Sequence, residues 1–173
     1  MAQESSPKPA IVVPLVKLAV FTLLVPGTVT LWLPRYLYPS IYRSSIHWDA
    51  TSVAAVLVIA LGVAGYLWTS FDFAFQGRGT PAPIDPPKEL VVRGLYRYIR
   101  NPMYISVAMV LAGECLLFRS WILARYLGFC FGCFFLFVLF YEEPALRHKF
   151  GPTYEQYCRD VPRWLPRLRR PPH

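Results

Sequence analysis

Apolar residues in this chain are gathered into long blocks that charged residues avoid. The clearest block, residues 50–71, is 22 residues long and contains no Asp, Glu, Lys or Arg. A helix needs about 20 residues to cross the roughly 30 Å of hydrocarbon in a bilayer. The block therefore predicts a membrane-spanning helix.

An earlier apolar block covers residues 11–33, where Lys17 is the single charged residue. Pro14 and Pro26 predict a kink, because proline lacks the backbone N–H and clashes with the preceding turn of a helix. The block is longer than the hydrophobic core of a secretory signal, which has about 7 to 15 residues. We therefore expect an uncleaved membrane helix.

Residues 102–141 carry three charged side chains, Glu114, Arg119 and Arg125, and are long enough for two crossings. We expect a tight turn at Arg119 and Ser120, between helices over about 102–118 and 121–141. Antiparallel helices would bring Glu114 and Arg125 to the same depth, which predicts a structural ion pair. The alternative is a proton or ligand site, a common role of intramembrane carboxylates.

Four spans would place both termini and the connection between the second and third spans on one side. Thirteen Lys and Arg residues fall on that side and three on the other. Because cytoplasmic loops are rich in Lys and Arg, we expect a multi-pass membrane protein with its termini and active face in the cytoplasm. The predicted fold class is all-α: a single domain over 1–173, a bundle of four transmembrane helices with short cytosolic C-terminal helices.

The composition agrees with a membrane protein. Of the 173 residues, 55% are apolar and 16% are charged, whereas soluble domains carry about 25% charged residues. The net charge of +8 comes from residues that flank the apolar blocks. No groove-reading motif accompanies it, so we expect no nucleic-acid partner. Cys130 and Cys133 lie in apolar sequence without a second ligand pair, so we expect no metal site.

The start of the third span is a candidate binding site. Asn101 is a preferred N-cap residue and Pro102 suits the first helical turn, which predicts a helix start here. The N-terminus of a helix attracts anions, and Arg100 and Tyr104 lie beside it in sequence. The pattern predicts either a site for the carboxylate of a small ligand or simply a well-capped membrane helix.

Glu142 and Glu143 follow the fourth span directly, where the negative end of the helix dipole disfavours carboxylates. A cationic ligand, Arg147, Lys149 or the basic connection could compensate them, and the spacing does not decide among these. An anion site combined with a carboxylate pair matches a zwitterion that has an extra positive centre. S-adenosylmethionine has this charge pattern.

Two stretches resemble known motifs. Residues 88–104, KELVVRGLYRYIRNPMY, look like the LVxxGxYxxxRHPxY signature of the isoprenylcysteine carboxyl methyltransferase and phospholipid methyltransferase superfamily. Residues 142–166 contain EEPALRHKFGPTYEQY and VPRWLP, which are similar to that family's EExxLxxxFGxxYxxYxxxVPxxxP tail. The likeness covers roughly residues 76–168, and the first two spans match in hydropathy only.

The resemblance implies an integral-membrane methyltransferase that holds S-adenosylmethionine on its cytosolic side, with segments 76–104 and 142–168. The acceptor is expected to be a lipophilic small molecule or a lipid that enters from the bilayer. The residues expected at the cofactor, most of them from the resemblance and Arg100 from the charge argument, are Lys88, Leu90, Val91, Tyr96, Arg100, Asn101, Pro102, Tyr104 and Glu142.

Three positions depart from the family pattern. Asn101 stands where the prenylcysteine enzymes have His, and Ser106 stands where many members have Gly. Val138 stands approximately where those enzymes have an Arg linked to the carboxyl substrate. The main expectation is therefore methylation of a lipophilic acceptor, with no catalytic residue assigned. Glu143 and His148 are candidate bases by their chemistry alone. The alternatives are N-methylation of a phosphatidylethanolamine-type headgroup, a non-catalytic membrane protein that keeps the fold, and a nicotinamide-binding relative of the sterol reductases.

Overall fold

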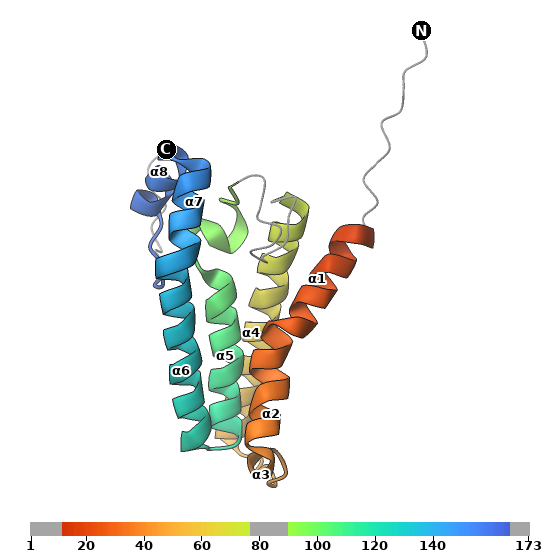
Figure 1. The fold of residues 1–173 in the computed structure, drawn as a ribbon. Helices are drawn as coiled ribbons and strands as arrows, with labels where there is room; N and C mark the ends of the chain where they lie inside the picture. The colour runs from red at the N-terminus through yellow and green to blue at the C-terminus, as the bar shows by residue number, and fades with distance from the viewer. Residues whose placement is uncertain (1–11, 77–89, 167–173) are drawn as a thin grey trace.

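The structure, a computed structural model, describes residues 12–76 and 90–166. Within those two ranges the chain is helical and contains no strand. The long helices run side by side, and the ends of α4, α5 and α7 meet at one end of the bundle, at the top in Figure 1. This end holds the segments in which the sequence predicts the site.

The N-terminal helical run is bent. It consists of α1 (Val12–Leu24), the π-helical turn η1 (Thr28–Trp32) and α2 (Leu33–Leu37), followed by the short α3 (Pro39–Tyr42). The α-helix is interrupted just before Pro26, where α1 leans away from the other helices in Figure 1. The predicted kink is therefore present, at the second of the two prolines.

Helices α4 (Ala50–Gln76) and α5 (Pro102–Leu117) pack closely through small residues. A Cβ atom at Gly65 would lie 2.7 Å from the hydroxyl oxygen of Ser106, and one at Gly62 would lie 2.8 Å from the Ser106 carbonyl oxygen. On α5, a Cβ atom at Gly113 would lie 2.9 Å from the carbonyl oxygen of Ala55. Small residues let membrane helices approach this closely, and the contact fixes α5 against α4.

The last long helix continues past its predicted end at residue 141. It runs through α6 (Trp121–Phe137), the π-helical turn η3 (Val138–Glu142) and α7 (Glu143–Phe150). In the wider turn the Glu143 N–H bonds to the Val138 carbonyl, and this turn brings the chain to Pro144 without a break. Gly151, at φ +52°, separates α7 from α8 (Pro152–Asp160), because glycine adopts positive φ without strain.

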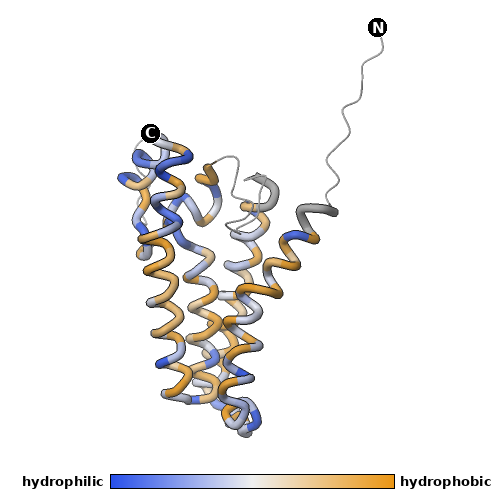
Figure 2. The backbone as a smooth tube through the Cα atoms, in the orientation of Figure 1, coloured by the Kyte–Doolittle hydropathy of each residue, from blue (hydrophilic) through white to orange (hydrophobic). Residues whose placement is uncertain are grey.

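Among the described residues, three helical runs are long and apolar enough to cross a membrane: Val16–Leu37, Ala50–Phe73 and Trp121–Phe150. The predicted span over 102–118 is the shorter apolar helix α5, whose 16 residues extend about 24 Å. Figure 2 shows apolar residues along the helices and hydrophilic ones mainly toward the two ends of the bundle, including α7 and α8. The structure thus supports an integral-membrane helical bundle with three full-length spans.

The predicted ion pair between Glu114 and Arg125 is wrong. The Tyr42 hydroxyl donates a 2.9 Å hydrogen bond to Glu114, and an Arg35 nitrogen lies 3.6 Å from the same carboxylate. The Arg35 guanidinium also stacks over the Tyr42 ring at 4.4 Å. Arg125 is on the exposed side of α6, and Glu114 is instead bound by residues of α2 and α3. The turn predicted at Arg119 is present, with φ 47°.

Candidate functional site

The segment that follows α8 lies on the start of α5. The backbone N–H of Arg100 donates to the Pro162 carbonyl at 2.9 Å, and the Asn101 side-chain amide donates to the Arg163 carbonyl at 3.2 Å. The expected side-chain cap by Asn101 is not formed, although α5 does begin at Pro102. The Asn101 amide therefore holds the C-terminal segment in place rather than capping its own helix.

A buried tyrosine joins the second half of the connection to α8. The Tyr157 hydroxyl donates a 2.8 Å hydrogen bond to the carbonyl of Tyr96, which lies in the 3-10 turn η2 (Gly94–Arg97). Tyr154, Tyr157 and Val161 form a small core on which Leu90 packs. Burial first, and then the nearby Glu142 carboxylate, raise the pKa of Tyr96 well above its ordinary value. The Tyr96 phenol is therefore neutral and able to donate.

Gly94 allows the connection to pass close to the end of α4. It has φ +55°, and a Cβ atom there would lie 3.0 Å from the Trp68 indole nitrogen and would overlap the Asp72 carboxylate. A larger residue would strain the backbone and displace both side chains. The glycine therefore sets where η2, which begins at Gly94, sits on the bundle.

Glu143 is buried in a network of arginines. Its side chain is 4% exposed and accepts two hydrogen bonds from Arg163, at 2.6 and 2.8 Å. A nitrogen of Arg100 lies 3.1 Å from the same carboxylate, and Arg147 approaches to 3.9 Å. The bond to Glu143 raises the pKa of Arg163. A forked, charge-assisted pair of this kind is both strong and geometrically specific.

Glu142 has a different partner. The Tyr104 hydroxyl donates a 2.7 Å hydrogen bond to its Oε2 atom. Within residues 12–76 and 90–166 this is the one hydrogen bond of the Glu142 side chain, although a carboxylate can accept about four. The π-helical turn η3 ends at Glu142, and such turns occur frequently at functional sites. The two adjacent carboxylates thus have separate roles, Glu143 holding the C-terminal segment and Glu142 keeping spare acceptor capacity.

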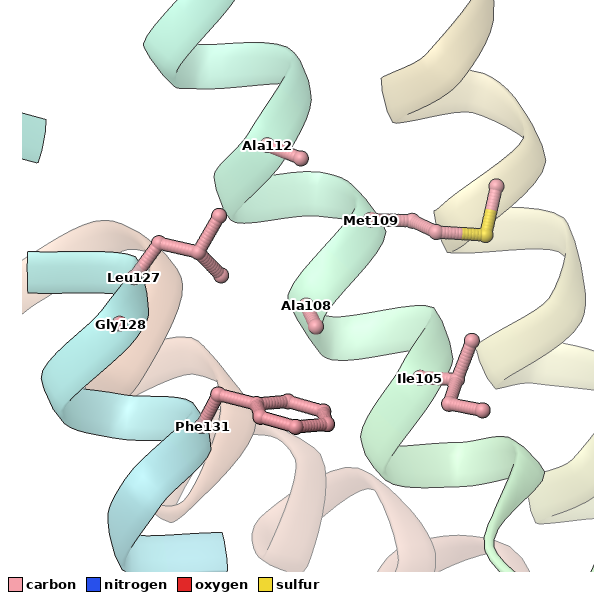
Figure 3. A pocket seen from close by; sticks show the side chains of 7 residues that line it. All are labelled: Ile105, Ala108, Met109, Ala112, Leu127, Gly128 and Phe131. Atoms are coloured by element: carbon pink, nitrogen blue, oxygen red, sulfur yellow. The ribbon is translucent and has the colours of Figure 1, made fainter. Parts of the chain in front are cut away.

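An apolar groove of about 410 Å³ lies between α5 and α6. Figure 3 shows Leu127 and Phe131 extending from α6 toward Ala108 on α5. The centre of the Trp164 ring lies 5.1 Å from that of Phe131, a residue of the groove, and 6.4 Å from that of Tyr104. The full lining consists of Ile105, Ala108, Met109, Ala112, Leu127, Gly128 and Phe131. Phe131 thus links the groove to Trp164, and Trp164 contacts Tyr104, the partner of Glu142.

Most residues expected at the cofactor converge on this end of the bundle. Tyr104 bonds Glu142 directly, Pro102 is buried, and Val91 is buried near Leu90. Lys88 lies outside the described residues. Arg163 and Trp164 were not foreseen, although both belong to the VPRWLP stretch. The one feature of the sequence that could have indicated them is their position inside a stretch that resembles the family's tail.

A family model of the phospholipid methyltransferases matches residues 50–153. This chain belongs to the phospholipid methyltransferase family. The match starts with α4 and includes the Gly94 turn, Tyr104, Glu142 and Glu143. Membership in the phospholipid methyltransferase family supports a membrane methyltransferase kind of function, and the long apolar helices are consistent with a membrane protein.

One curated relative has a different name, the nickel-cobalt-cadmium resistance protein NccN of Alcaligenes xylosoxydans xylosoxydans. It is 28% identical over 127 residues, which cover 70% of this chain and 55% of NccN. The chain thus spans about half the length of this relative. No solved structure matches the chain.

Proposed function

We propose that this chain transfers a methyl group from S-adenosylmethionine to a lipophilic acceptor at the end of the bundle formed by α5, α7 and α8. The observation that carries the proposal is the Glu142 carboxylate, which has a single hydrogen bond, from Tyr104, in the described part of the chain. The cofactor carries an ammonium group and ribose hydroxyls, which are hydrogen-bond donors that a carboxylate accepts. The residues present therefore fit the cofactor.

The residues that would hold it come from three places. Glu142 and Tyr104 supply polar contacts, Tyr96 supplies a neutral phenol, and the backbone around Leu90 and Val91 lies next to α8. Lys88, Arg100, Asn101 and Pro102 complete the proposed site. Arg100 and Asn101 would contribute indirectly, by holding the site's other parts in place. The Arg100 side chain binds Glu143, and the Asn101 side chain binds the Arg163 carbonyl in the segment after α8.

When bound, S-adenosylmethionine supplies an electrophilic methyl group on a sulfonium. The chain then has to align an acceptor with that methyl group, and positioning of this kind lowers the barrier by removing entropy in advance. The groove between α5 and α6 is lined by apolar residues and can take the acceptor's tail. A carboxylate acceptor would need no proton removed, whereas an amine acceptor would need to lose one.

The two candidate bases differ in their surroundings. Glu143 is held by Arg163 and Arg100, so its carboxylate oxygens are already engaged by guanidinium groups. His148 is exposed on α7. Of these two candidates, one is bound by arginines and the other is exposed. Neither is an unengaged base beside Glu142, which favours the isoprenylcysteine carboxyl methyltransferase-like reading, with an acceptor that is already deprotonated. The second candidate is N-methylation of a phosphatidylethanolamine-type lipid; the matched phospholipid methyltransferase family is compatible with both reactions.

We also propose that this end of the bundle and both termini face the cytoplasm, because the sequence places most of the Lys and Arg residues there. A cysteine-free background with single cysteines at residue 148 and at residue 45 would test the orientation in sealed cells. An impermeant thiol reagent should label the cysteine at residue 45 and spare the one at residue 148. The reverse pattern would overturn the orientation.

Calorimetric titration of S-adenosylmethionine into the detergent-purified chain tests cofactor binding. We expect micromolar affinity, its loss in Glu142→Ala, and its retention in Glu155→Ala, which changes an exposed carboxylate on α8. Absence of binding in the unmodified chain would favour the non-catalytic alternative.

Radiolabelled donor incubated with extracted lipids then separates the two candidate reactions. An alkali-labile product indicates a methyl ester. An alkali-stable label on an ethanolamine lipid indicates N-methylation.

A further inference from the structure

The indole of Trp164 has a polar atom with no partner. Its Nε1 atom is shielded from solvent and has no hydrogen bond to any residue within 12–76 and 90–166. The ring itself packs against other aromatic rings. Its centre lies 5.1 Å from that of Phe131, 6.1 Å from that of Phe135 and 6.4 Å from that of Tyr104. A buried donor left without an acceptor costs about 1–3 kcal/mol. This cost would be removed by a ligand that supplies the acceptor atom.

The position of the ring relates the unpaired N–H to the groove. Phe131 contacts Trp164 and also lines the groove between α5 and α6. Tyr104 contacts Trp164 on its other side and donates to Glu142. Trp164 therefore contacts one residue of the apolar groove and one residue of the proposed cofactor site. An acceptor whose tail occupies the groove would bring its polar head toward the reacting methyl group, on the side where Trp164 lies.

The chemistry of the indole restricts that head. An indole N–H donates one hydrogen bond and cannot accept any. An oxygen atom with a lone pair satisfies it, whereas an ammonium group, which only donates, leaves it unpaired. A site with a buried polar group left unpaired discriminates strongly against the ligand that fails to pair it.

We propose that Trp164 is a specificity-determining residue that donates its indole N–H to an oxygen of the acceptor's head, while the acceptor's single apolar tail lies in the groove between α5 and α6. This inference rests on the proposed function and narrows its acceptor to an amphiphile with an oxygen head. Carboxylate and phosphate oxygens share this chemistry, and the experiment separates them.

The test uses the full chain in lipid nanodiscs and a photoreactive diazirine derivative of palmitate. Unlabelled palmitate, hexadecyl phosphate and hexadecylamine, which have matched tails, compete for crosslinking, and mass spectrometry maps the crosslinked peptides. We expect crosslinks on α5 and α6 and weaker competition by hexadecylamine. The stronger of the two oxygen-headed competitors identifies the head group.

Trp164→Phe keeps the aromatic ring and removes the N–H. We expect it to weaken competition by the preferred oxygen-headed ligand about tenfold, the effect of one hydrogen bond to a charged group, and to leave hexadecylamine unchanged. Trp121→Phe is the matched control, because Trp121 is 73% exposed at the far end of α6. Ala108→Leu, which fills the groove, should weaken all three competitors.

Equal losses for oxygen-headed and amine ligands in Trp164→Phe, no change at all, or crosslinks that avoid α5 and α6 would each overturn the proposal. Titration of S-adenosylmethionine into the same proteins keeps the two hypotheses apart. Trp164→Phe should bind it as the unmodified chain does. If the unmodified chain fails to bind it, the proposed function fails, while the competition result still decides the role of Trp164 in binding an amphiphile.

Discussion

The Tyr104 hydroxyl and the Glu142 carboxylate, 38 positions apart in the chain, are joined by a hydrogen bond of 2.7 Å. This bond ties the first turn of α5 to the π-helical turn that ends α6. It brings together one residue from each of the two motifs by which the sequence resembles membrane methyltransferases. The pair is therefore the most direct place to test whether the two motifs form one site.

Tyr104→Phe should weaken S-adenosylmethionine binding about fivefold, which corresponds to about 1 kcal/mol for one hydrogen bond. The substitution keeps the ring that packs 5.2 Å from Phe134 and removes only the hydroxyl that orients Glu142. Isothermal titration in detergent measures the effect. Tyr141→Phe, on an exposed neighbouring ring, serves as the control, and equal affinities in both variants would exclude the Tyr104 hydroxyl from the site.

Arg163→Gln should lower the free energy of unfolding by about 3 kcal/mol, because it removes the main partner of a buried carboxylate. Glu143 would keep Arg100 at 3.1 Å but lose both short bonds. Thermal unfolding in detergent measures the loss. Arg159→Gln on the surface of α8, where the side chain contacts only Gln156 in the described part of the chain, should change it little. A comparable loss of unfolding free energy in the two variants would show that the bonds to Glu143 stabilise the fold no more than a surface contact does.

Gly62→Ala should destabilise the bundle by about 1–3 kcal/mol, the usual effect of overpacking. The added methyl group would lie 2.8 Å from a backbone oxygen of α5, which cannot move aside as a side chain can. Gly132→Ala on α6 is the control, because its methyl group would meet nothing within 4 Å. Thermal unfolding of both variants should separate them clearly, and a stable Gly62→Ala would show that α4 and α5 are not in close contact.

Asp49 predicts a pH dependence at the opposite end of the bundle. The Ser52 backbone N–H and then Arg119 lower the pKa of the Asp49 carboxyl. Its stabilising effect is therefore complete above the unfolded pKa of about 3.9 and is lost as the pH falls through the lower folded pKa. The melting temperature should fall as the pH is lowered below about 4. Asp49→Asn should reduce this dependence, and identical pH profiles for both proteins would exclude the Asp49 contribution.

The long helices could be predicted because their apolar blocks are local properties of the sequence. Residues 50–71 contain no charge and lie within α4, and Pro26 marks the bend before η1. The last span was predicted to end at residue 141, because the apolar block ends there and two carboxylates follow. The π-helical turn let the chain continue to Phe150, and local composition does not reveal a change in hydrogen-bond pattern.

Contacts between distant segments were harder to predict. Glu142 was singled out because a carboxylate at that place needs a partner, but the partner of Glu143 could not be chosen from spacing. Arg163 is 20 positions away and reaches Glu143 only because Gly151 reverses the chain between α7 and α8. Glu114 is a similar case, because it binds Arg35 and Tyr42, more than 70 positions away, instead of Arg125, which is closer in the sequence.

The glycine contacts between α4 and α5 also limit how the molecule can open. With backbone atoms this close, α4 and α5 cannot slide past each other without overlap and must move as one rigid body. A widening of the groove therefore requires displacement of α6 and the continuous α7. Glu142 lies at the end of the helical run of α6, and Tyr104 lies on α5. A displacement of α6 that admits a bulky tail would therefore also lengthen the hydrogen bond between Tyr104 and Glu142.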